Sequence, residues 1–461
     1  MIESPGVSVS AIPRRQVVAW AFWDWAGAAF NAVITTFVFT VYLTSNLFID
    51  PAVLADRGSN PAAYESAVAG LSSGLALALT IGGIFVALIA PVMGQRSDSS
   101  GRRKLWLGIN TGVIVLVMAL LFFVQAAPGF FAYGVILIAI GNVFFEIASV
   151  NYNAMLVQVS TPRTIGRVSG LGWGAGYLGG IVLLLVLYVG FIAGDGPYWF
   201  GVTDANGMNI RVVALFCAAW TLIFALPVLL AVPENKPAVA ARERVSFFRS
   251  YVVLIGDIKR LFRDSRPTFY FLLASAVYRD GLAAVFTFGG VLAAVTFGFS
   301  AGQVLIFGIA ANVVAGIGTM LSGLFDDRFG AKPVIITALV GLIVSGTAVF
   351  LFHDGGTAAF WIGGLFLCLF VGPAQSASRT FLGRIAPVGR EGEIFGLYAT
   401  TGRAVSFLAP GLFALFITWF GAQYWGILGI ILVLALGLGL LIPVKTPPHA
   451  RAGRVLAPAT D

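Results

Sequence analysis

The chain has 461 residues, of which 59% are hydrophobic and only 10% are charged, and its formal net charge is +8. Soluble proteins carry about 25% charged residues, so this composition excludes an ordinary soluble domain. Apolar stretches of about 18 residues or more recur from end to end, and each is long enough to cross a bilayer as a helix. Because backbone groups in lipid must satisfy their own hydrogen bonds, we predict an all-α polytopic membrane protein and not a barrel of short alternating strands.

Twelve apolar segments are candidate membrane spans. In chain order we place them at 18–48, 68–93, 105–125, 130–157, 168–192, 211–232, 268–297, 303–325, 333–352, 358–382, 394–418 and 422–443. With a cytoplasmic N-terminus, all but five of the 28 Lys and Arg residues fall in cytoplasmic segments; the exceptions are Arg57 and Arg211 outside, and Arg279, Arg379 and Arg403 within spans. This asymmetry follows the positive-inside rule and predicts that both termini are cytoplasmic.

The longest hydrophilic stretch divides the spans into two groups of six. Its apolar positions between Val245 and Phe262 recur at helical spacing among basic residues, which predicts an amphipathic helix on the cytoplasmic membrane surface. We therefore expect an N-terminal half at 1–232, a linker at 233–267, a C-terminal half at 268–443 and a tail at 444–461. A docking site for a regulatory partner in the linker is the alternative to a plain connection.

The loops of the two groups carry a repeat. GQRSDSSGRRK at 94–104 matches GLFDDRFGAK at 323–332 with an offset of 229 residues. NAMLVQVSTPRTIGRVSGL, which starts at Asn153, matches RTFLGRIAPVGREGEIFGL, which starts at Arg379, with an offset of 226 residues. Because each group has an even number of spans, both have the same orientation. We predict two parallel six-helix repeats related by an axis along the membrane normal.

The loop pattern Gly-x3-Asp-x2-Gly-Arg-[Arg/Lys], with twelve spans and a weaker copy in the second half, resembles the signature of the major facilitator superfamily. A closer resemblance is to the vacuole-effluxer branch, which includes transporters implicated in moving amino acids out of the vacuole. The segments that carry it are WDWAGAAFNAVITTFVFTVY, YNAML, GRVSGLGWGAGYLGG, YRDG and REGEIFGLYATTGRA. The resemblance implies the major facilitator fold and a transport function.

The repeated loop motif is a candidate conformational latch between the halves. Gly94 and Gly101 are expected to allow tight turns between closely packed helices. Asp98 is expected to accept hydrogen bonds from helix N-terminal amides or from an Arg. The predicted latch residues are Gly94, Asp98, Gly101, Arg102, Arg103, Asp327 and Gly330. The alternative is that these residues only fix topology and packing.

Six charged residues lie within the spans. They are the acids Asp24, Glu146 and Asp280 and the bases Arg279, Arg379 and Arg403. Each is costly in lipid unless it is paired or hydrated, so each is a candidate functional residue. All except Arg403 lie on the first, fourth, seventh and tenth spans, which line the central cavity in the fold implied by the resemblance. Polar residues also recur at helical spacing on the fourth span, at Asn142, Glu146, Ser149 and Asn153.

Estimated depth along the spans places Arg279 and Asp280 near the midplane, and Asp24, Glu146, Arg379 and Arg403 nearer the cytoplasm. The predicted substrate or coupling residues are Asn31, Asn142, Glu146, Ser149, Asn153, Tyr278, Arg279, Asp280 and Gln375. The predicted inner gate of ion pairs consists of Asp24, Arg379 and Arg403, which lie deeper toward the cytoplasm. Alternatively, all the intramembrane charges form permanent ion pairs that specify helix packing.

The sequence contains no phosphate-binding loop, no metal-ligand spacing and no nucleophile–base pair. We therefore expect neither an enzyme nor a bound cofactor or metal, but a secondary active transporter that works by alternating access. The solute is expected to be small and polar or zwitterionic, and the resemblance favours an amino acid. Glu146 and Asp24 are the candidate proton carriers if transport is proton-coupled.

Two alternatives remain open on the same fold. One is a non-transporting membrane sensor or scaffold, and the other is a transporter of a sugar, an organic anion or a drug. The expected partners are a small-molecule solute and the lipid bilayer, without nucleic acid, and the protein is expected to be a monomer. Because Arg greatly outnumbers Lys, as in GC-rich bacterial genomes, a bacterial plasma membrane is the expected location.

Overall fold

The computed structural model describes residues 12–194, 198–234, 256, 259, 261–263 and 265–445. Within these ranges every regular element is a helix, and twelve helical segments are long and apolar enough to cross a membrane. The prediction of an all-α protein with twelve spans is therefore confirmed. The linker helix predicted between Val245 and Phe262, and nearly all of the predicted tail, lie outside the described residues, and the domain boundaries stay predictions.

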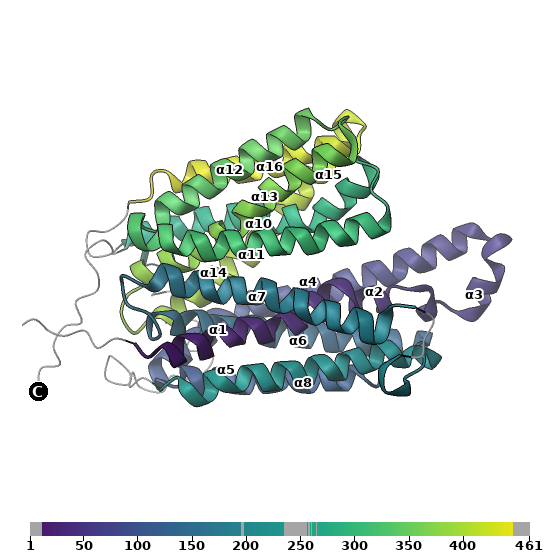
Figure 1. Ribbon diagram of the computed structural model, residues 1–461, viewed down its shortest axis with the longest axis horizontal. Coiled ribbons are helices and arrows are strands. Elements are labelled where there is room, and N and C mark those ends of the chain that lie inside the picture. The colour runs from purple at the N-terminus through teal and green to yellow at the C-terminus, as the bar shows by residue number, and fades with distance from the viewer. Residues whose placement is uncertain are drawn as a thin grey trace, which may run out of the picture.

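The helices of the N-terminal half follow the predicted spans closely. They are α1 (Arg14–Ala28), which continues as a π-helix (Ala29–Phe37) and α2 (Phe39–Leu43), then α4 (Pro61–Ser100), α5 (Arg103–Leu121), α6 (Phe131–Ala154), α7 (Ile165–Leu187) with a π-helical end (Tyr188–Ile192), and α8 (Met208–Ala231). The short α3 (Pro51–Ala55) connects the first two spans. With 40 residues, α4 is longer than a bilayer requires, and Figure 1 shows it projecting with α3 beyond the other helices.

The C-terminal half has one divided span. Its helices are α10 (Arg266–Val295), α11 (Ala301–Phe329), α12 (Ala331–Leu351), α13 (Gly356–Ile385), α14 (Glu391–Val405), α15 (Leu408–Phe420) and α16 (Gly426–Leu441). The eleventh span is divided between α14 and α15. Pro410 accounts for this break, because it has no N–H to donate and its ring would collide with the carbonyl of Ser406 in a continuous helix.

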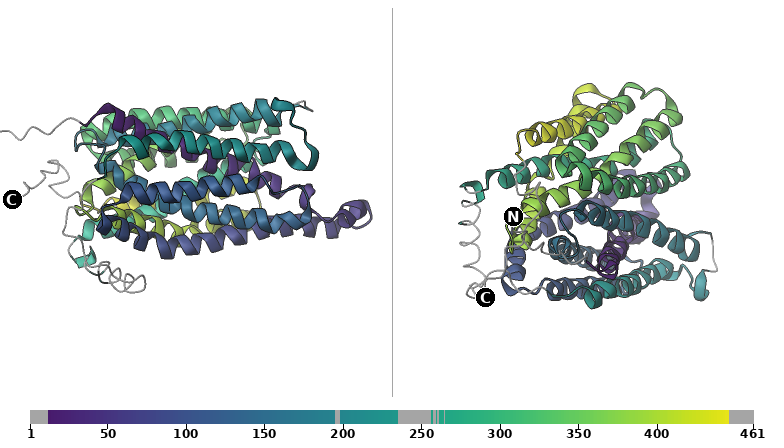
Figure 2. Two further views of the ribbon diagram at one scale, coloured as in Figure 1. Left: turned by 90° about the horizontal axis from the view of Figure 1, so that it is seen from below. Right: turned by 60° about the vertical axis from the view of Figure 1, so that its left-hand side comes forward.

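Each half has its own hydrophobic core. One buried cluster consists only of N-terminal residues, from Trp20 to Val232, and the other is centred on α10, α12, α13 and α16. Figure 1 shows the two halves as separate bundles, the first purple to teal and the second green to yellow, and the right-hand view in Figure 2 also shows them apart. The fold is therefore two six-helix bundles side by side.

The halves meet along two pairs of helices that are equivalent in the repeat, α4 with α14 and α7 with α11. Glycines allow the close approach. A Cβ atom added to Gly94 would lie 2.0 Å from the carbonyl oxygen of Gly392, and one added to Gly323 would lie 2.6 Å from that of Gly166. The tight turn expected at Gly94 is therefore wrong, because this residue lies inside α4 and lets two helices touch.

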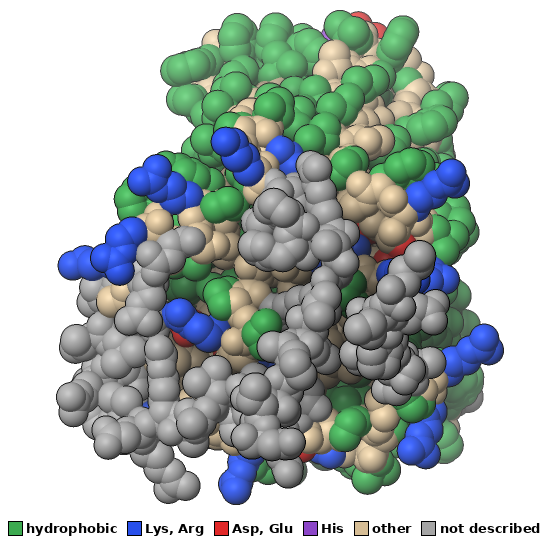
Figure 3. Space-filling view, turned by 90° about the vertical axis from the view of Figure 1, so that its left-hand side faces the viewer, with side chains coloured by type: hydrophobic (Ala, Val, Ile, Leu, Met, Phe, Trp, Pro, Cys, Tyr) green, Lys and Arg blue, Asp and Glu red, His purple; other side chains and the backbone are tan. Residues whose placement is uncertain are grey.

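The turns themselves lie at the last glycine of each motif copy. Gly101 follows α4 with φ of 63°, and Gly330 separates α11 from α12 with φ of 89°, conformations that favour glycine. These loops lie at the end of the molecule where α1 begins and α16 ends, which we call the basic end. Figure 3 views the molecule from the basic end and shows Lys and Arg side chains around its rim.

Candidate functional site

The first polar cluster between the halves surrounds Asp98 at the basic end. Nη2 of Arg103 lies 2.5 Å from Oδ1 of Asp98 and 2.7 Å from Oε2 of Glu391. Oδ2 of Asp98 accepts a hydrogen bond of 2.9 Å from the backbone N–H of Glu393. All four residues are buried. Because α14 begins at Glu391, the N-terminal half supplies the cap for a helix of the other half.

A second cluster repeats this geometry on the other flank. Oδ1 of Asp327 accepts a hydrogen bond of 2.7 Å from the backbone N–H of Gly166, and Oδ2 accepts one of 3.2 Å from that of Arg167. Asp327 thus caps the start of α7 as Asp98 caps the start of α14. The side chains differ, because Nε of Arg167 lies 2.8 Å from Asp327 but the Arg167 side chain is 54% exposed. Arg102 is exposed at the start of α5 and lies outside both clusters.

Arg379 is the centre of the third cluster, deeper in the membrane. Its Nε and Nη2 donate to the hydroxyl and the carbonyl oxygen of Ser169 at 2.9 and 2.6 Å. Its Nη1 donates to Asp24 at 3.3 Å and to Asn153 at 3.2 Å. The hydroxyl of Tyr152 also donates to Asp24, at 2.8 Å. One guanidinium group from α13 therefore links α1, α6 and α7 of the other half.

Aromatic rings enclose this guanidinium. Its Cζ lies 4.9 Å from the ring centroid of Trp20 and 5.6 Å from those of Tyr152 and Trp173. Each of these three rings therefore makes a cation–π contact with Arg379. Arg379 and Asn153 are equivalent positions of the repeat, so their contact lies where the two halves face each other across the symmetry axis.

The fourth cluster is an ion pair between Arg403 on α14 and Glu146 on α6. Arg403 passes α4 beside Gly83, where an added Cβ atom would lie 3.8 Å from Cδ of Arg403. The Arg403 and Glu146 side chains are 33% and 29% exposed. Among the charged side chains described above that form polar contacts between the halves, only that of Arg167 is more exposed. The sequence analysis placed Arg403 in the gate and Glu146 in the substrate region; the structure places them together.

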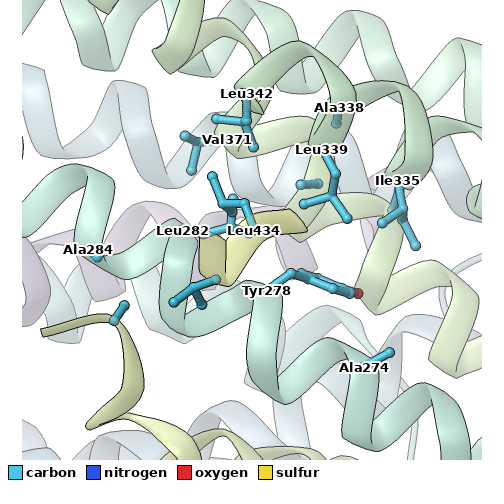
Figure 4. Packing of buried hydrophobic residues seen from close by; sticks show 14 of the residues in the cluster. Ala274, Tyr278, Leu282, Ala284, Ile335, Ala338, Leu339, Leu342, Val371 and Leu434 are labelled. Atoms are coloured by element: carbon cyan, nitrogen blue, oxygen red, sulfur yellow. The ribbon is translucent and has the colours of Figure 1, made fainter. Parts of the chain in front are cut away.

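Tyr278 lies in the core of the C-terminal half. Its hydroxyl shares a hydrogen bond of 2.6 Å with that of Ser378, and the residue is fully buried. Figure 4 shows its ring among buried apolar residues that include Leu282 and Leu434. This position makes Tyr278 a packing residue in the conformation described by the structure.

Arg279 and Asp280 contact other helices of the same half. Cζ of Arg279 lies 3.7 Å from the ring centroid of Tyr398, and its Nη1 donates to the Tyr398 carbonyl oxygen at 2.9 Å. Oδ2 of Asp280 accepts a hydrogen bond of 2.6 Å from the backbone N–H of Ala409. Asp280 therefore caps α15 at the break in the eleventh span. The structure does not pair these two neighbours with each other.

The remaining predicted residues make no side-chain hydrogen bond to another helix in the part of the chain that the structure describes. Asn31 is exposed in the π-helix of the first span. Asn142 and Ser149 are half-buried on α6, and Ser149 bonds to its own helix at Phe145. Oε1 of Gln375 is buried without a hydrogen-bond partner among the described residues. Within the same residues, no group of three His, Cys, Asp or Glu side chains is arranged to hold a metal ion.

Three important residues were missed from the sequence: Ser169, Tyr152 and Glu391. Ser169 lies in the segment GRVSGL and Tyr152 in YNAML, which overlap the internal repeat and belong to the family resemblance but contain no charge inside a span. Glu391 lies three residues before the predicted eleventh span, in a loop where an acidic residue is not unusual. Only the partner across the interface distinguishes these residues from other small or polar side chains.

The clusters of Asp98 and Asp327 lie at the basic end, and those of Arg379 and Arg403 lie deeper. Arg379 is six residues from the basic end of α13 and Arg403 is twelve residues from that of α14, or roughly 9 and 18 Å along their helices. The contacts described here involve α4 from Gly83 onward and α7 up to Trp173, the portions nearer the basic end. The halves are therefore joined at the basic end, and Glu146 and Arg403 are the deepest charged contact.

Comparison with known proteins agrees with the fold and the motifs. Residues 158–452 match the family described as vacuole effluxer Atg22 like. The chain is 25% identical to the uncharacterized MFS-type transporter YxiO of Bacillus subtilis (strain 168), across 94% of this chain and 96% of YxiO. It is 24% identical to autophagy-related protein 22-1 of Aspergillus fumigatus across 60% of this chain, an alignment that spans 48% of the fungal protein.

Solved structures share the architecture at low sequence identity. The proton:xylose symporter XylE superposes with a TM-score of 0.71 at 16% identity, covering 95% of this chain and 98% of XylE. The transporter FucP in its outward conformation superposes with a TM-score of 0.67 at 15% identity, covering 95% and 99%. The fold is thus that of the major facilitator superfamily. The chain belongs to the vacuole effluxer Atg22-like family and is a membrane transporter of the major facilitator type, not an enzyme.

Proposed function

We propose that the protein is a secondary active transporter that moves a small polar or zwitterionic solute by alternating access, with an amino acid as the favoured class. The observation that carries this proposal is the uneven distribution of contacts between the halves. Polar clusters join the halves at the basic end, whereas Glu146 and Arg403 remain partly exposed at greater depth. Such an arrangement is expected of a transporter closed on one side and accessible from the other.

The clusters around Asp98 and Asp327 act as a latch in this proposal. Each carboxylate caps a helix that belongs to the opposite half, so both caps are lost when the halves separate at the basic end. In the first cluster the ion pair that crosses between the halves, Arg103 with Glu391, is buried. In the second the crossing pair of Asp327 is with the exposed Arg167, while Arg384 of its own half lies 4.0 Å from Asp327. Gly94 and Gly323 permit the close packing that brings both carboxylates into place.

Asp24 and Arg379 act as the inner gate, and Asp24 is the proposed proton carrier. Protonation of Asp24 removes the charge that faces Nη1 of Arg379, and the guanidinium then keeps only neutral acceptors, Ser169 and Asn153. Because a buried cation without its anion is strongly disfavoured, proton binding weakens the closed gate. A proton gradient can therefore bias opening toward one side.

Flux measurements in proteoliposomes test the function. Labelled amino acids and other small polar solutes are expected to accumulate in response to a pH gradient in the wild type. Asp24→Asn is expected to abolish gradient-driven accumulation while exchange of solute across the membrane continues, and Asp56→Asn, on the exposed surface at the opposite end, serves as control. Full accumulation by Asp24→Asn eliminates Asp24 as carrier, and absence of flux for every solute favours the sensor or scaffold.

The basic end is proposed to face the cytoplasm of a bacterial cell. Lys and Arg side chains gather there, as the positive-inside rule requires for cytoplasmic loops. Cysteine placed at exposed Arg57, at the opposite end, is expected to react with a membrane-impermeant maleimide in intact cells. Cysteine at exposed Arg102 is expected to react only after permeabilisation. Native Cys217 and Cys368 are buried, so background labelling is expected to be low.

A further inference from the structure

The ion pair between Glu146 and Arg403 differs from the other polar contacts between the halves. Each half contributes one charge, Glu146 from α6 and Arg403 from α14. Both side chains are about one-third exposed, whereas the Arg379 side chain is 4% exposed. Arg379 also donates from all three of its nitrogen atoms, and four of its five N–H groups already have a partner in the protein. Among the described residues Arg403 donates to Glu146 through Nη2 alone.

The exposed part of this pair faces water and not lipid. The pair lies on membrane-spanning helices, roughly 18 Å from the basic end along α14. A charged pair exposed to hydrocarbon at this depth is strongly disfavoured. Arg403 also lies against α4 at Gly83, and Thr400 on the same helix donates to the carbonyl oxygen of Ala87. The pair therefore belongs to the interface between the halves, farther from the basic end than the other charged clusters.

We propose that a zwitterionic solute binds by replacing this ion pair, with its ammonium group on Glu146 and its carboxylate on Arg403. This inference rests on the proposed transport function. It specifies a zwitterion as the substrate class and Glu146 and Arg403 as the two residues that bind its charged groups. A zwitterion offers each side chain a new partner of opposite charge, so both charges stay compensated. A solute with one charge leaves the other side chain unpaired, which disfavours its binding. Because this ion pair joins the two halves, a solute that replaces it also changes the contact between them.

A matched set of ligands tests this requirement directly. Alanine, leucine and glutamine carry both charges, their N-acetyl derivatives carry only the carboxylate, and their methyl esters carry only the ammonium. In thermal-shift measurements on the purified full-length protein, at least one of the three amino acids is expected to raise the unfolding temperature. Its two derivatives are expected to bind at least tenfold more weakly.

Single substitutions are expected to reverse the preference. Glu146→Gln leaves Arg403 without its anion, so the N-acetyl derivative is expected to bind at least tenfold better relative to the amino acid. Arg403→Gln leaves Glu146 without its cation, so the methyl ester is expected to gain in the same way. Glu65→Gln, on the exposed surface of α4, is the matched control and is expected to keep the wild-type preference.

The double variant Glu146→Gln with Arg403→Gln separates recognition from packing. If the pair only holds the helices together, replacing both charges at once is tolerated, and solute binding survives. If the pair binds the solute, the double variant folds normally, but its affinity for the amino acid falls at least tenfold. Circular dichroism and size-exclusion chromatography establish that each variant is folded before binding is compared.

Three outcomes overturn the proposal. They are full binding by the double variant, unchanged preference in both single variants, and equal binding of the amino acid and its derivatives by the wild type. Each leaves the transport function intact if proteoliposomes still accumulate a solute. Binding of amino acids without flux of any solute has the opposite meaning, because it supports the recognition site and contradicts the transport function.

Discussion

Replacing Gly94 by alanine is expected to prevent full closure at the basic end. The added Cβ would lie 2.0 Å from the carbonyl oxygen and 2.5 Å from the carbonyl carbon of Gly392, and 3.0 Å from the backbone nitrogen of Glu393. All three of these atoms belong to the backbone, so they cannot move away by a side-chain rotation. Real Cβ contacts are essentially never shorter than 3.0 Å, so α4 and α14 must separate by about 1 Å.

The separation has a calculable effect on the latch. The hydrogen bond from the Glu393 N–H to Asp98 is 2.9 Å long, and a shift of this size carries it outside the usual hydrogen-bond range. Overpacking of this kind costs about 1–3 kcal/mol. Because the cost applies only to the closed state, it shifts the equilibrium between the closed and open states by roughly 5- to 150-fold.

Distances between spin labels at the exposed Arg102 and Arg328 positions measure this equilibrium. Gly94→Ala is expected to move population from the short to the long distance, and Gly323→Ala is expected to act in the same direction with a smaller displacement. Gly112→Ala is the matched control, because a Cβ there meets no atom within 4 Å. A Gly94→Ala variant with the wild-type distance distribution refutes the argument that glycine is required for closure.

Further predictions concern stability and can be measured by thermal unfolding in detergent. Arg379→Ala leaves the half-buried Asp24 without its cation and is expected to cost about 3 kcal/mol, whereas Asp24→Asn combined with Arg379→Met is expected to cost less; a similar loss in both would contradict the ion pair. Gly289 borders an apolar cavity of about 60 Å³, and a Cβ atom added there would meet no atom within 4 Å. Gly289→Ala is therefore expected to raise the free energy of unfolding by about 1 kcal/mol through helix propensity and burial of the added methyl group. Asp280→Leu removes the cap on Ala409 and is expected to cost about 1 kcal/mol, while Asp280→Asn keeps an acceptor and is expected to be nearly neutral; equal losses would show that the cap contributes nothing.

Local sequence properties determined much of the fold. The length and apolarity of the spans require helices in a bilayer, and the repeated loop motif places Gly101 and Gly330 where positive φ is needed. The offset of the repeat also identified equivalent positions, and Asn153 and Arg379 do meet across the interface. These features depend on residues close together in the chain or on comparison of two similar segments.

The pairing of charges was decided only by the tertiary structure. Helical periodicity places Glu146 and Arg403 on faces of their own helices, but it does not specify which helix lies opposite, and these partners are 257 residues apart. The π-helix over Ala29–Phe37 also changes the rotation of the first span after Asp24, which a count at 3.6 residues per turn does not anticipate. Ser169 gains its role because Arg379 and Ser376 approach it from the other half. The sequence by itself therefore determined which residues the membrane helices carry, and the packing of the two halves determined which of them act together.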